Sequence, residues 1–274
     1  MTSKAKNVNY SALIKEIMAE HNIVRKNPSV YIEKLKTHLK YFRGDIIYKP
    51  GCFPLRTYEG KACYEDAIEF LQRQKPVNEL IDNEKLHKAC QDHVNDIGPS
   101  GICSHDGSDG SNPSDRIERY CEWDLACCEN IDFGSSTAED IVISLIVDDG
   151  ISERNHRKNL FSADVKFVGV ASGPHKDMQH CTVISYVGDI RNLGEPSKHK
   201  ANIVDELLKH EENKNNGKSI SNPYQENDPD APDDTIGLKI VRTTKIIKGK
   251  PTKITKKVYT LADNSLHVVE IMEN

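Results

Sequence analysis

The stretch VKFVGVASGPHKDMQHCTVISYV, residues 165–187, contains two β-prone runs separated by residues typical of a turn. Valine, isoleucine, phenylalanine and tyrosine are frequent in residues 165–171 and 181–187. The segment between them, SGPHKDMQH, contains glycine, proline and aspartate, which favour a chain reversal. The pattern therefore predicts a β-hairpin that closes a larger unit.

Upstream of this hairpin, the hydrophobic residues recur at the three- and four-residue intervals of a helix. Two cap signals mark helix starts: Asn27-Pro28, and the capping box Ser136-Thr137-Ala138-Glu139. Helices are thus expected to dominate the first half of the chain. They should cover about residues 10–25, 28–41, 65–74 and 84–97, and a further helix should end at Gly150.

Length and composition favour one main domain with a smaller addition. The chain has 274 residues, of which 29% are charged and 37% hydrophobic, and its formal net charge is -5. A single core of about 150–200 residues fits within this length. Because the chain has no basic excess, nucleic acid is not expected as a partner.

The beginning of the sequence lacks the continuous apolar run of a signal peptide, and no later stretch is apolar enough to span a bilayer. The eight cysteines are interpreted as mostly reduced and buried. We therefore expect a cytoplasmic protein with no transmembrane segment. A secreted protein is the alternative if the start is truncated.

From Gly194 onward the composition changes. Residues 194–234 are rich in Asn, Glu, Asp, Lys and Pro and predict a polar, flexible linker, with one short helix at 201–209. Residues 235–274 contain three β-prone runs separated by turn-like segments, which predicts a three-stranded antiparallel meander. The expected organisation is a domain at 10–193, the linker, and a small β appendage.

Asp149 follows Ile141 and Leu145 at intervals of four residues. Helical phase therefore predicts that Asp149 points inward, while Asp148 falls on the polar side. A buried carboxylate needs a cation, a metal ion or hydrogen-bond donors to offset its desolvation. The alternative is a structural role, in which backbone N–H groups of a neighbouring loop bind the carboxylate of Asp149.

His105 lies in residues 98–116, whose Gly, Ser, Asp and Pro content predicts a long, functional loop. Glu129 occupies a short segment that is too apolar for a surface carboxylate without a specific role. Two imidazoles and one or two carboxylates around a cleft can hold zinc with open positions. His21 and His93 lie on apolar helix faces and are expected to be hydrogen-bonded core histidines. No serine or cysteine lies in a recognisable nucleophile signature.

Three short motifs follow one another along the chain. His21-Asn22-Ile23-Val24-Arg25 has the form HNxxR, Cys128-Glu129-Asn130-Ile131 with Gly134 is similar to GEN[ILV]xxG, and His156-Arg157-Lys158-Asn159 is similar to the end of RGHRxN. Over residues 10–190 the chain resembles the CAP superfamily (cysteine-rich secretory protein, antigen 5, pathogenesis-related 1), in its protist or bacterial-type branch. The motif residues expected to have structural roles are His21, Asn22, Arg25, His93, Asn130, Gly134, Arg157 and Asn159.

The resemblance implies an α+β fold, namely a three-layer α-β-α sandwich with a central antiparallel sheet and a large cleft. In many relatives a His-Glu-Glu-His tetrad lines that cleft and can bind zinc. Carried over to this sequence, the tetrad falls on His105, Glu129, Asp149 and His180, with His156 as the alternative to His180. Zn2+ is the cofactor that this set implies. Cys128 and Asn155 stand where the family pattern has glycine.

The resemblance favours a binding protein whose polar-lined cleft takes a small hydrophobic ligand such as a sterol or lipid, a peptide, or a divalent metal. A scaffold that recruits a protein partner through its appendage or the helix at 201–209 is the first alternative. The second is a metal-dependent hydrolase in which Glu129 acts as general base on a zinc-bound water. That reaction needs three metal ligands and a free acid, which is one group more than the sequence supplies. An enzyme is therefore not the preferred interpretation.

Overall fold

The computed structural model describes residues 8–194, 235–247, 250–261 and 266–273. Contacts divide the chain into two compact units, Met1–Glu195 and Pro196–Asn274, which are described separately. Residues 195–234, including the helix expected at 201–209, lie outside the described residues.

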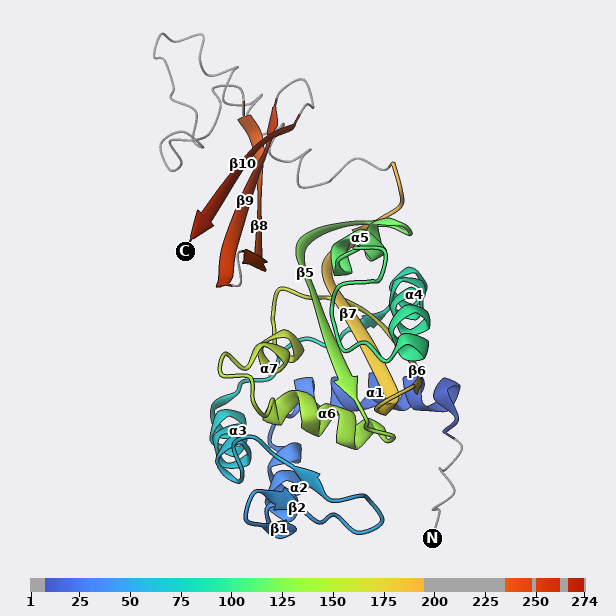
Figure 1. The fold of residues 1–274 in the computed structure, drawn as a ribbon, viewed down its shortest axis with the longest axis vertical. Helices are drawn as coiled ribbons and strands as arrows, with labels where there is room; N and C mark the ends of the chain where they lie inside the picture. Colours follow the sequence, from blue (N-terminus) through green and yellow to red (C-terminus); the bar gives the residue numbers. More distant parts are fainter. Residues whose placement is uncertain (1–7, 195–234, 248–249, 262–265, 274) are drawn as a thin grey trace. The chain divides into compact units, whose positions relative to one another are not determined.

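A four-stranded sheet in the order β4-β6-β7-β5 lies at the centre of the first unit (Figure 1). The hairpin predicted from residues 165–187 is present, with Val170 of β6 opposite Ile184 of β7. β5 also pairs antiparallel with β7, whereas the short β4 pairs parallel with β6 and makes one edge of the sheet mixed. The strands are β4 (Ile81–Asp82), β5 (Glu122–Phe133), β6 (Phe167–His175) and β7 (Gln179–Arg191).

Helices pack on both faces of this sheet, and a small three-stranded ribbon follows the second helix (Figure 1). The ribbon consists of β1 (Phe42–Arg43), β2 (Ile46–Ile47) and β3 (Leu55–Arg56). The helices are α1 (Tyr10–Lys26), α2 (Val30–Leu39), α3 (Ala62–Arg73), α4 (Glu84–Ser100), α5 (Pro113–Glu118), α6 (Ala138–Val147) and α7 (Asn155–Leu160).

Alternate residues of the central strands face opposite layers, as the two-residue period of a strand requires. Val170 and Ile184 pack in the core with α1, α2, α3 and α6, whereas Ala171 and Val183 pack in the core beneath α4. Gly169 brings α4 close to the sheet, because a Cβ at this position would overlap the backbone of the helix. The predicted α+β class and the three-layer arrangement of helix, sheet and helix are confirmed.

Three local predictions were wrong. Residues 122–133, interpreted only as a short apolar segment around Glu129, form the long strand β5. The helix expected to end at Gly150 ends at Val147. Asn27, expected to cap the start of the second helix, is instead the C-cap of α1, and Ser29 precedes α2. The expected loop at 98–116 contains the short helix α5, but residues 101–112 lack helix and strand as predicted.

The second unit contains three antiparallel strands in the order β10-β9-β8. β8 (Thr235–Ile247) pairs with β9 (Lys250–Leu261), which pairs with β10 (Leu266–Glu273). The predicted three-stranded meander is therefore confirmed. Within the described residues, no helix is both long and apolar enough to cross a membrane.

None of the eight cysteines, all of which lie in the described part of the chain, forms a disulfide. Cys63, Cys90, Cys121 and Cys181 are buried, whereas Cys52 and Cys103 are exposed. The expectation of reduced, mostly buried thiols therefore holds for four of the eight, and two more are half-buried.

Candidate functional site

Glu129 lies on β5 with its carboxylate enclosed by the protein. The side chains of Glu129 and Arg116 are both only 2% exposed, and Nη2 of Arg116 lies 2.9 Å from Oε2 of Glu129. Nη2 also donates to Oε1 of Glu129 at 3.1 Å. The guanidinium therefore balances a charge that would otherwise be costly to bury.

His105 contacts the same carboxylate from the loop after α4. Its Nδ1 lies 2.8 Å from Oε1 of Glu129, and its side chain is 48% exposed. Two contacts hold this loop in place. Nη2 of Arg116 donates to the carbonyl of His105 at 3.0 Å, and Nε2 of the buried His93 lies 2.8 Å from the carbonyl oxygen of Ser104. The Nδ1 edge of the imidazole is thus held against Glu129, while about half of the side chain is exposed to solvent.

His156 forms a second pair of the same kind with Asp148. Its Nδ1 lies 2.7 Å from Oδ1 of Asp148, and its backbone N–H donates to Oδ2 at 2.8 Å. The Asp148 side chain is 1% exposed, whereas that of His156 is 23% exposed. Asp148 has φ 54 and ψ 46, a left-handed conformation that ends α6 and turns its carboxylate toward α7.

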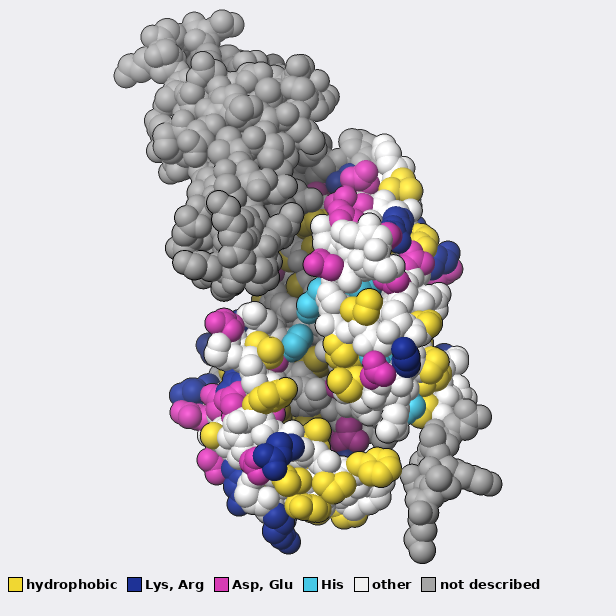
Figure 2. All heavy atoms as spheres, in the orientation of Figure 1, with side chains coloured by type: hydrophobic (Ala, Val, Ile, Leu, Met, Phe, Trp, Pro, Cys, Tyr) yellow, Lys and Arg dark blue, Asp and Glu magenta, His cyan; other side chains and the backbone are white. Residues whose placement is uncertain are grey.

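The two histidine–carboxylate pairs lie side by side. The ring centroids of His105 and His156 are 6.3 Å apart, with an interplanar angle of 32°. Because both Nδ1 atoms face carboxylates, both Nε2 atoms are left without a hydrogen-bond partner among the described residues. Figure 2 shows histidine side chains at the surface in a furrow of the face that it displays. Two partly exposed imidazole rings therefore lie close to each other, each held by a buried carboxylate.

Side chains of two motif asparagines hold α7 against β5, and so hold His156 beside Glu129. Nδ2 of Asn130 donates to the carbonyl of His156 at 3.0 Å. Nδ2 of Asn159 donates to Oδ1 of Asn130 at 2.9 Å and to the carbonyl of Glu129 at 3.3 Å. The juxtaposition of the two histidine pairs therefore depends on these two amides.

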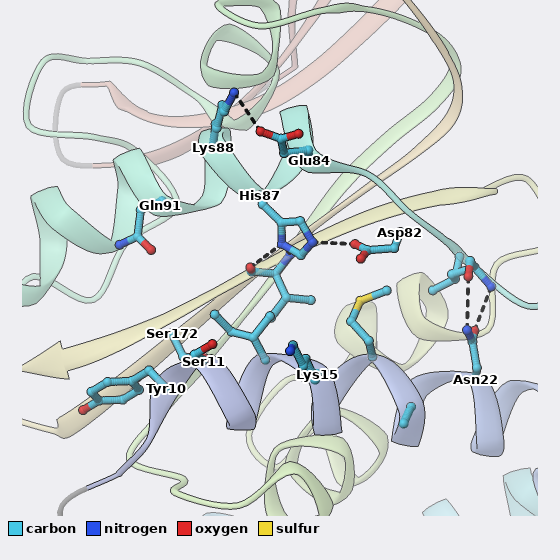
Figure 3. Close-up of a pocket in the computed structure, with 15 residues that line it drawn as sticks. Tyr10, Ser11, Lys15, Asn22, Asp82, Glu84, His87, Lys88, Gln91 and Ser172 are labelled. Carbon is cyan, nitrogen blue, oxygen red and sulfur yellow. Dashed lines mark hydrogen bonds and ion pairs between the residues drawn. The ribbon is translucent and has the colours of Figure 1, made fainter.

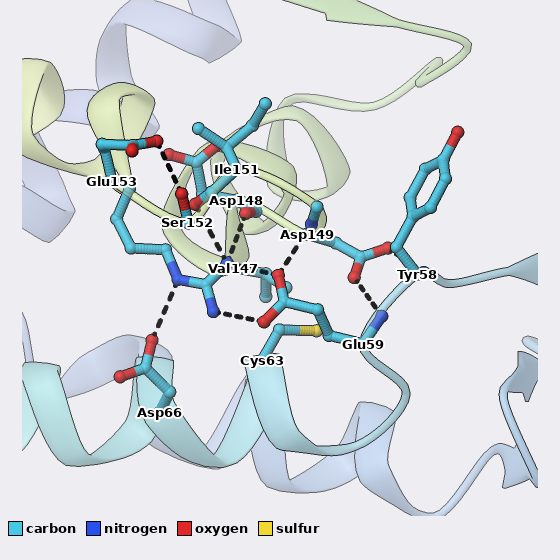
Figure 4. A network of polar contacts seen from close by, with 12 residues as sticks. Tyr58, Glu59, Cys63, Asp66, Val147, Asp148, Asp149, Ile151, Ser152 and Glu153 are labelled. Atoms are coloured by element: carbon cyan, nitrogen blue, oxygen red, sulfur yellow. Dashed lines mark hydrogen bonds and ion pairs between the residues drawn. The ribbon is translucent and has the colours of Figure 1, made fainter.

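The structure does not bring Asp149 to this site, and the expected inward orientation was wrong. Its carboxylate accepts the backbone N–H groups of Tyr58 at 2.8 Å and Glu59 at 2.9 Å, before α3 (Figure 4). The structure thus shows the structural alternative, in which backbone N–H groups of a loop bind this carboxylate. Because α6 ends at Val147, helical phase no longer applies to the residues beyond it, and Asp148 is the buried acid.

Two arginines, Arg154 and Arg157, tie the segment after α6 to α3 and to the residues before it. Arg154 donates to Glu59 at 2.6 Å and to Asp66 at 3.2 Å. These charged hydrogen bonds with Arg154 lower the pKa of Glu59 to about 2. The buried Arg157 also reaches Asp66, at 2.9 Å, and donates to the carbonyls of Ile146 and Val147. The turn that carries Asp148 is thus anchored on both sides.

His180 also lies away from the pair. Its Nδ1 is 2.8 Å from the hydroxyl of Tyr10, on α1. Partial burial lowers the pKa of His180. Of the five candidate site residues, the structure thus brings together His105, Glu129 and His156, and places Asp149 and His180 elsewhere.

The remaining motif residues cross-link the scaffold. Buried His21 contacts the carbonyl of Ile17 and the hydroxyl of Tyr186, both at 2.9 Å. Asn22 exchanges two hydrogen bonds with the backbone of Leu80, at 2.7 and 3.1 Å. Buried Arg25 donates to the carbonyls of Asn78, Leu160 and Ser162. Gly134, at φ 92, ends β5 in a conformation that favours glycine.

Sequence analysis missed two residues of the site, Arg116 and Asp148. Arg116 lies on α5 between Asp115 and the buried Ile117, and the polar sequence around it carries no signal that its guanidinium is buried. The Asp-Asp-Gly sequence at 148–150 could have indicated the helix end, because aspartate tolerates a left-handed conformation.

Burial disfavours the thiolate form of several cysteines. Burial raises the pKa of Cys90 and Cys128 to about 12, and partial burial also raises the pKa of Cys103. A reactive thiol needs the opposite shift, because the thiolate is the nucleophile.

The family model described as "CAP: Cysteine-rich secretory protein family" matches residues 18–187, which include both histidine pairs. The chain belongs to the CAP family. No curated protein matches it.

Two solved structures are similar to this CAP protein. One is an extracellular protein containing an SCP domain from Bacillus anthracis str. Ames, with 20% identity and a TM-score of 0.34; the match covers 41% of this chain and 35% of that one. The other is an outer surface protein from Borrelia burgdorferi, with 17% identity and a TM-score of 0.34; here 53% and 98% are covered. The cytoplasmic location expected for this chain stays a prediction.

The predicted four-residue zinc set does not form in this CAP protein. Among the described residues, no group of three His, Cys, Asp or Glu side chains is arranged to hold a metal ion. Glu129 is occupied by Arg116 and His105, Asp149 by loop backbone and His180 by Tyr10. The Nδ1 atoms of His105 and His156 face carboxylates, and the Nε2 atoms have no hydrogen-bond partner among the described residues.

The CAP protein also has a groove of about 830 Å3 between α1 and α4, along the edge of β6 (Figure 3). Its apolar lining includes Ile14, Met18 and Val170, and Lys15 and Lys88 are among its polar residues. His87 lies in the groove, where it contacts Asp82 and the backbone of Val170. The groove is separate from the two histidine pairs.

Proposed function

We propose that this CAP protein is a binding protein in which His105 and His156 hold a divalent cation, and that a ligand occupies the coordination positions left open. The observation that carries the proposal is the orientation of the rings: each Nδ1 faces a buried carboxylate, and neither Nε2 has a hydrogen-bond partner in the described part of the chain. A carboxylate behind a histidine fixes the tautomer and makes the other ring nitrogen a better metal ligand.

The open positions favour ligand binding. Structural zinc sites are usually closed by four protein ligands, and catalytic sites use three. A pair of histidine ligands leaves more coordination positions open than a structural or a catalytic zinc site does. A bound ion would therefore take further donor atoms from solvent or from a ligand. When bound, the ion would act as a Lewis acid for an oxygen or nitrogen atom of that ligand.

Hydrolysis is not favoured by the position of Glu129. Both of its oxygens accept hydrogen bonds from Arg116, and one also faces His105. A general base must be able to reach the proton that it removes, whereas this carboxylate holds a guanidinium and an imidazole in place. Glu129 is therefore assigned the role of orienting His105.

The test is a titration of the purified full-length protein with Co2+, followed by calorimetry and by the visible absorption of bound cobalt. His105→Ala and His156→Ala should each abolish binding. Glu129→Gln and Asp148→Asn should weaken it by about 10–100-fold, as is typical when the hydrogen-bond partner of a metal ligand is changed. His180→Ala is the matched control and should bind like the wild type.

Retention of cobalt binding in both His105→Ala and His156→Ala would contradict the proposal. So would a loss of binding in His180→Ala, because that histidine bonds to Tyr10 away from the pair. Circular dichroism of each variant verifies that the fold is kept.

A small hydrophobic ligand is the second candidate, and the groove between α1 and α4 supports it. A concave site with an apolar lining and a few polar groups is typical of small-molecule binding. Met18→Lys would place a charge in the groove and should reduce binding of a fluorescent fatty-acid analogue. Ile23→Lys, at a position of α1 that is 44% exposed and does not line the groove, is the control. Equal behaviour of the two variants would count against this site.

Recruitment of a protein through residues 235–274 stays a prediction. The three strands of the meander are described, but this alone does not favour a particular partner.

A further inference from the structure

The ribbon between α2 and α3 exposes several large apolar side chains. Within eleven residues, Tyr48 is 49% exposed, Phe53 71%, Leu55 61% and Tyr58 90%. Single exposed apolar residues are common on protein surfaces, but a group of this density usually marks an interaction site. Figure 2 shows hydrophobic side chains gathered at the lower end of the first unit, where Figure 1 places β1 and β2.

The ribbon is firmly attached to the domain beneath it. Phe42 and Ile47 are each 4% exposed and belong to the main core. Thr57 donates its hydroxyl to the carbonyl of Asp45 at 2.7 Å, and Lys49 forms an ion pair with Asp140 of α6. Asp149 accepts the backbone N–H of Tyr58. The exposed side chains therefore project from an anchored structure, so little ordering would be needed on binding.

The charge of this segment is opposite to that of the whole chain. Residues 40–61 contain five basic residues, at positions 40, 43, 49, 56 and 61, and two acidic ones, at positions 45 and 59. The segment thus has a net charge of +3 in a chain whose net charge is -5. A partner that complements it must combine negative charge with an apolar layer that can accept aromatic and aliphatic side chains.

We propose that residues 40–61 dock this protein on an anionic lipid surface, with Phe53, Leu55 and Tyr58 entering the headgroup region and the exposed basic residues, Lys40, Arg43, Arg56 and Lys61, facing lipid phosphates and carboxylates. Aromatic side chains favour the membrane interface because their rings are amphipathic. Each basic residue near an anionic leaflet adds to the attraction, and apolar insertion adds to it independently. The surface is separate from both the histidine pairs and the groove, so this inference does not depend on the proposed function.

The test uses the full-length protein and sedimentation with vesicles of phosphatidylcholine alone or of phosphatidylcholine mixed with phosphatidylserine. Binding is expected only to the mixed vesicles and should weaken as salt is added. Phe53→Ser/Leu55→Ser should lower the partition coefficient by at least about tenfold. Arg56→Gln/Lys61→Gln should lower it by about 25-fold, since each charge contributes about fivefold.

Leu125→Ser is the matched control, because Leu125 is 66% exposed on β5, outside the ribbon. It should bind like the wild type. Phe53→Trp gives a second measurement: its emission should shift to shorter wavelength on mixed vesicles, relative to a wild-type spectrum that comes from Trp123 alone. The signal does not depend on a loss of function, so it is informative even if a serine variant fails to fold.

Three results would overturn the proposal: no binding to mixed vesicles, equal losses in Leu125→Ser and Phe53→Ser/Leu55→Ser, or a Phe53→Trp emission that vesicles leave unchanged. Self-association that Phe53→Ser/Leu55→Ser abolishes, without vesicle binding, would assign the surface to a second copy of the chain instead.

Discussion

Replacing Arg116 by methionine should destabilise the CAP domain strongly. Arg116→Met keeps an apolar chain of similar length but leaves the carboxylate of Glu129, whose side chain is 2% exposed, without its cation. It also removes hydrogen bonds to the carbonyls of Ser111 and His105. Removing one partner of a buried ion pair typically costs about 3–5 kcal/mol of unfolding free energy. In a domain of this size that loss corresponds to a fall in Tm of about 6–20 °C.

The assay is urea unfolding followed by fluorescence of Trp123. This is the single tryptophan of the chain and lies on β5, so its signal reports on the unit that contains the site. The double variant Arg116→Met/Glu129→Met should recover much of the lost stability, because two apolar side chains often replace a buried ion pair at little cost. A loss below about 1 kcal/mol in Arg116→Met, or a double variant that loses the sum of both single effects, would refute this reasoning.

Three further predictions concern buried titratable groups and the end of α6. Burial lowers the pKa of His21 to about 4, so the stability that comes from keeping it neutral is complete above about pH 6.5 and falls by up to about 3 kcal/mol as the pH drops toward 4. His21→Gln should remove that slope in urea titrations at several pH values. Burial raises the pKa of Asp132 to about 6, so this carboxyl makes stability fall by up to about 3 kcal/mol as the pH rises from about 4 to 6. The free-energy difference between wild type and Asp132→Asn should therefore change over that interval, and a constant difference would contradict the assignment. Asp149→Ala should cost about 0.5–2 kcal/mol, as loss of a capping carboxylate does, yet leave cobalt binding unchanged; a loss of binding would show that Asp149 belongs to the site.

Much of the scaffold could be predicted from the sequence because its signals are local. The β-prone composition of β6 and β7, the helical spacing of α1 and the Ser-Thr cap signal before α6, where Thr137 is the N-cap, each depend on residues within one element. β5 was missed because its residues from Glu122 to Cys128 are only partly buried and show no regular alternation. Pairing with β7 along its length, interrupted by a bulge between Asp124 and Cys127, stabilises it as a strand.

The candidate site could be predicted only in part, because its geometry depends on contacts between distant segments. His105 and Glu129 were found from their unusual local surroundings, and the structure places them 2.8 Å apart. The prediction that Asp149, and not Asp148, points inward was wrong. It assumed that the helix continues, whereas Asp148 has a left-handed conformation that ends the helical phase. His156 was only the alternative to His180, since nothing local shows that Asn130 and Asn159 bring α7 against β5.

The central claim is that His105 and His156 form one binding site, each oriented by its own carboxylate. The most direct measurement is an NMR spectrum of the imidazole nitrogens in protein with labelled histidine, recorded during titration with Zn2+. The account predicts that Nε2 of His105 and Nε2 of His156 shift together, at the same stoichiometry, while the nitrogens of His21 and His180 stay unchanged. A shift of only one of the two rings, or a response of His180 in place of His156, would contradict it.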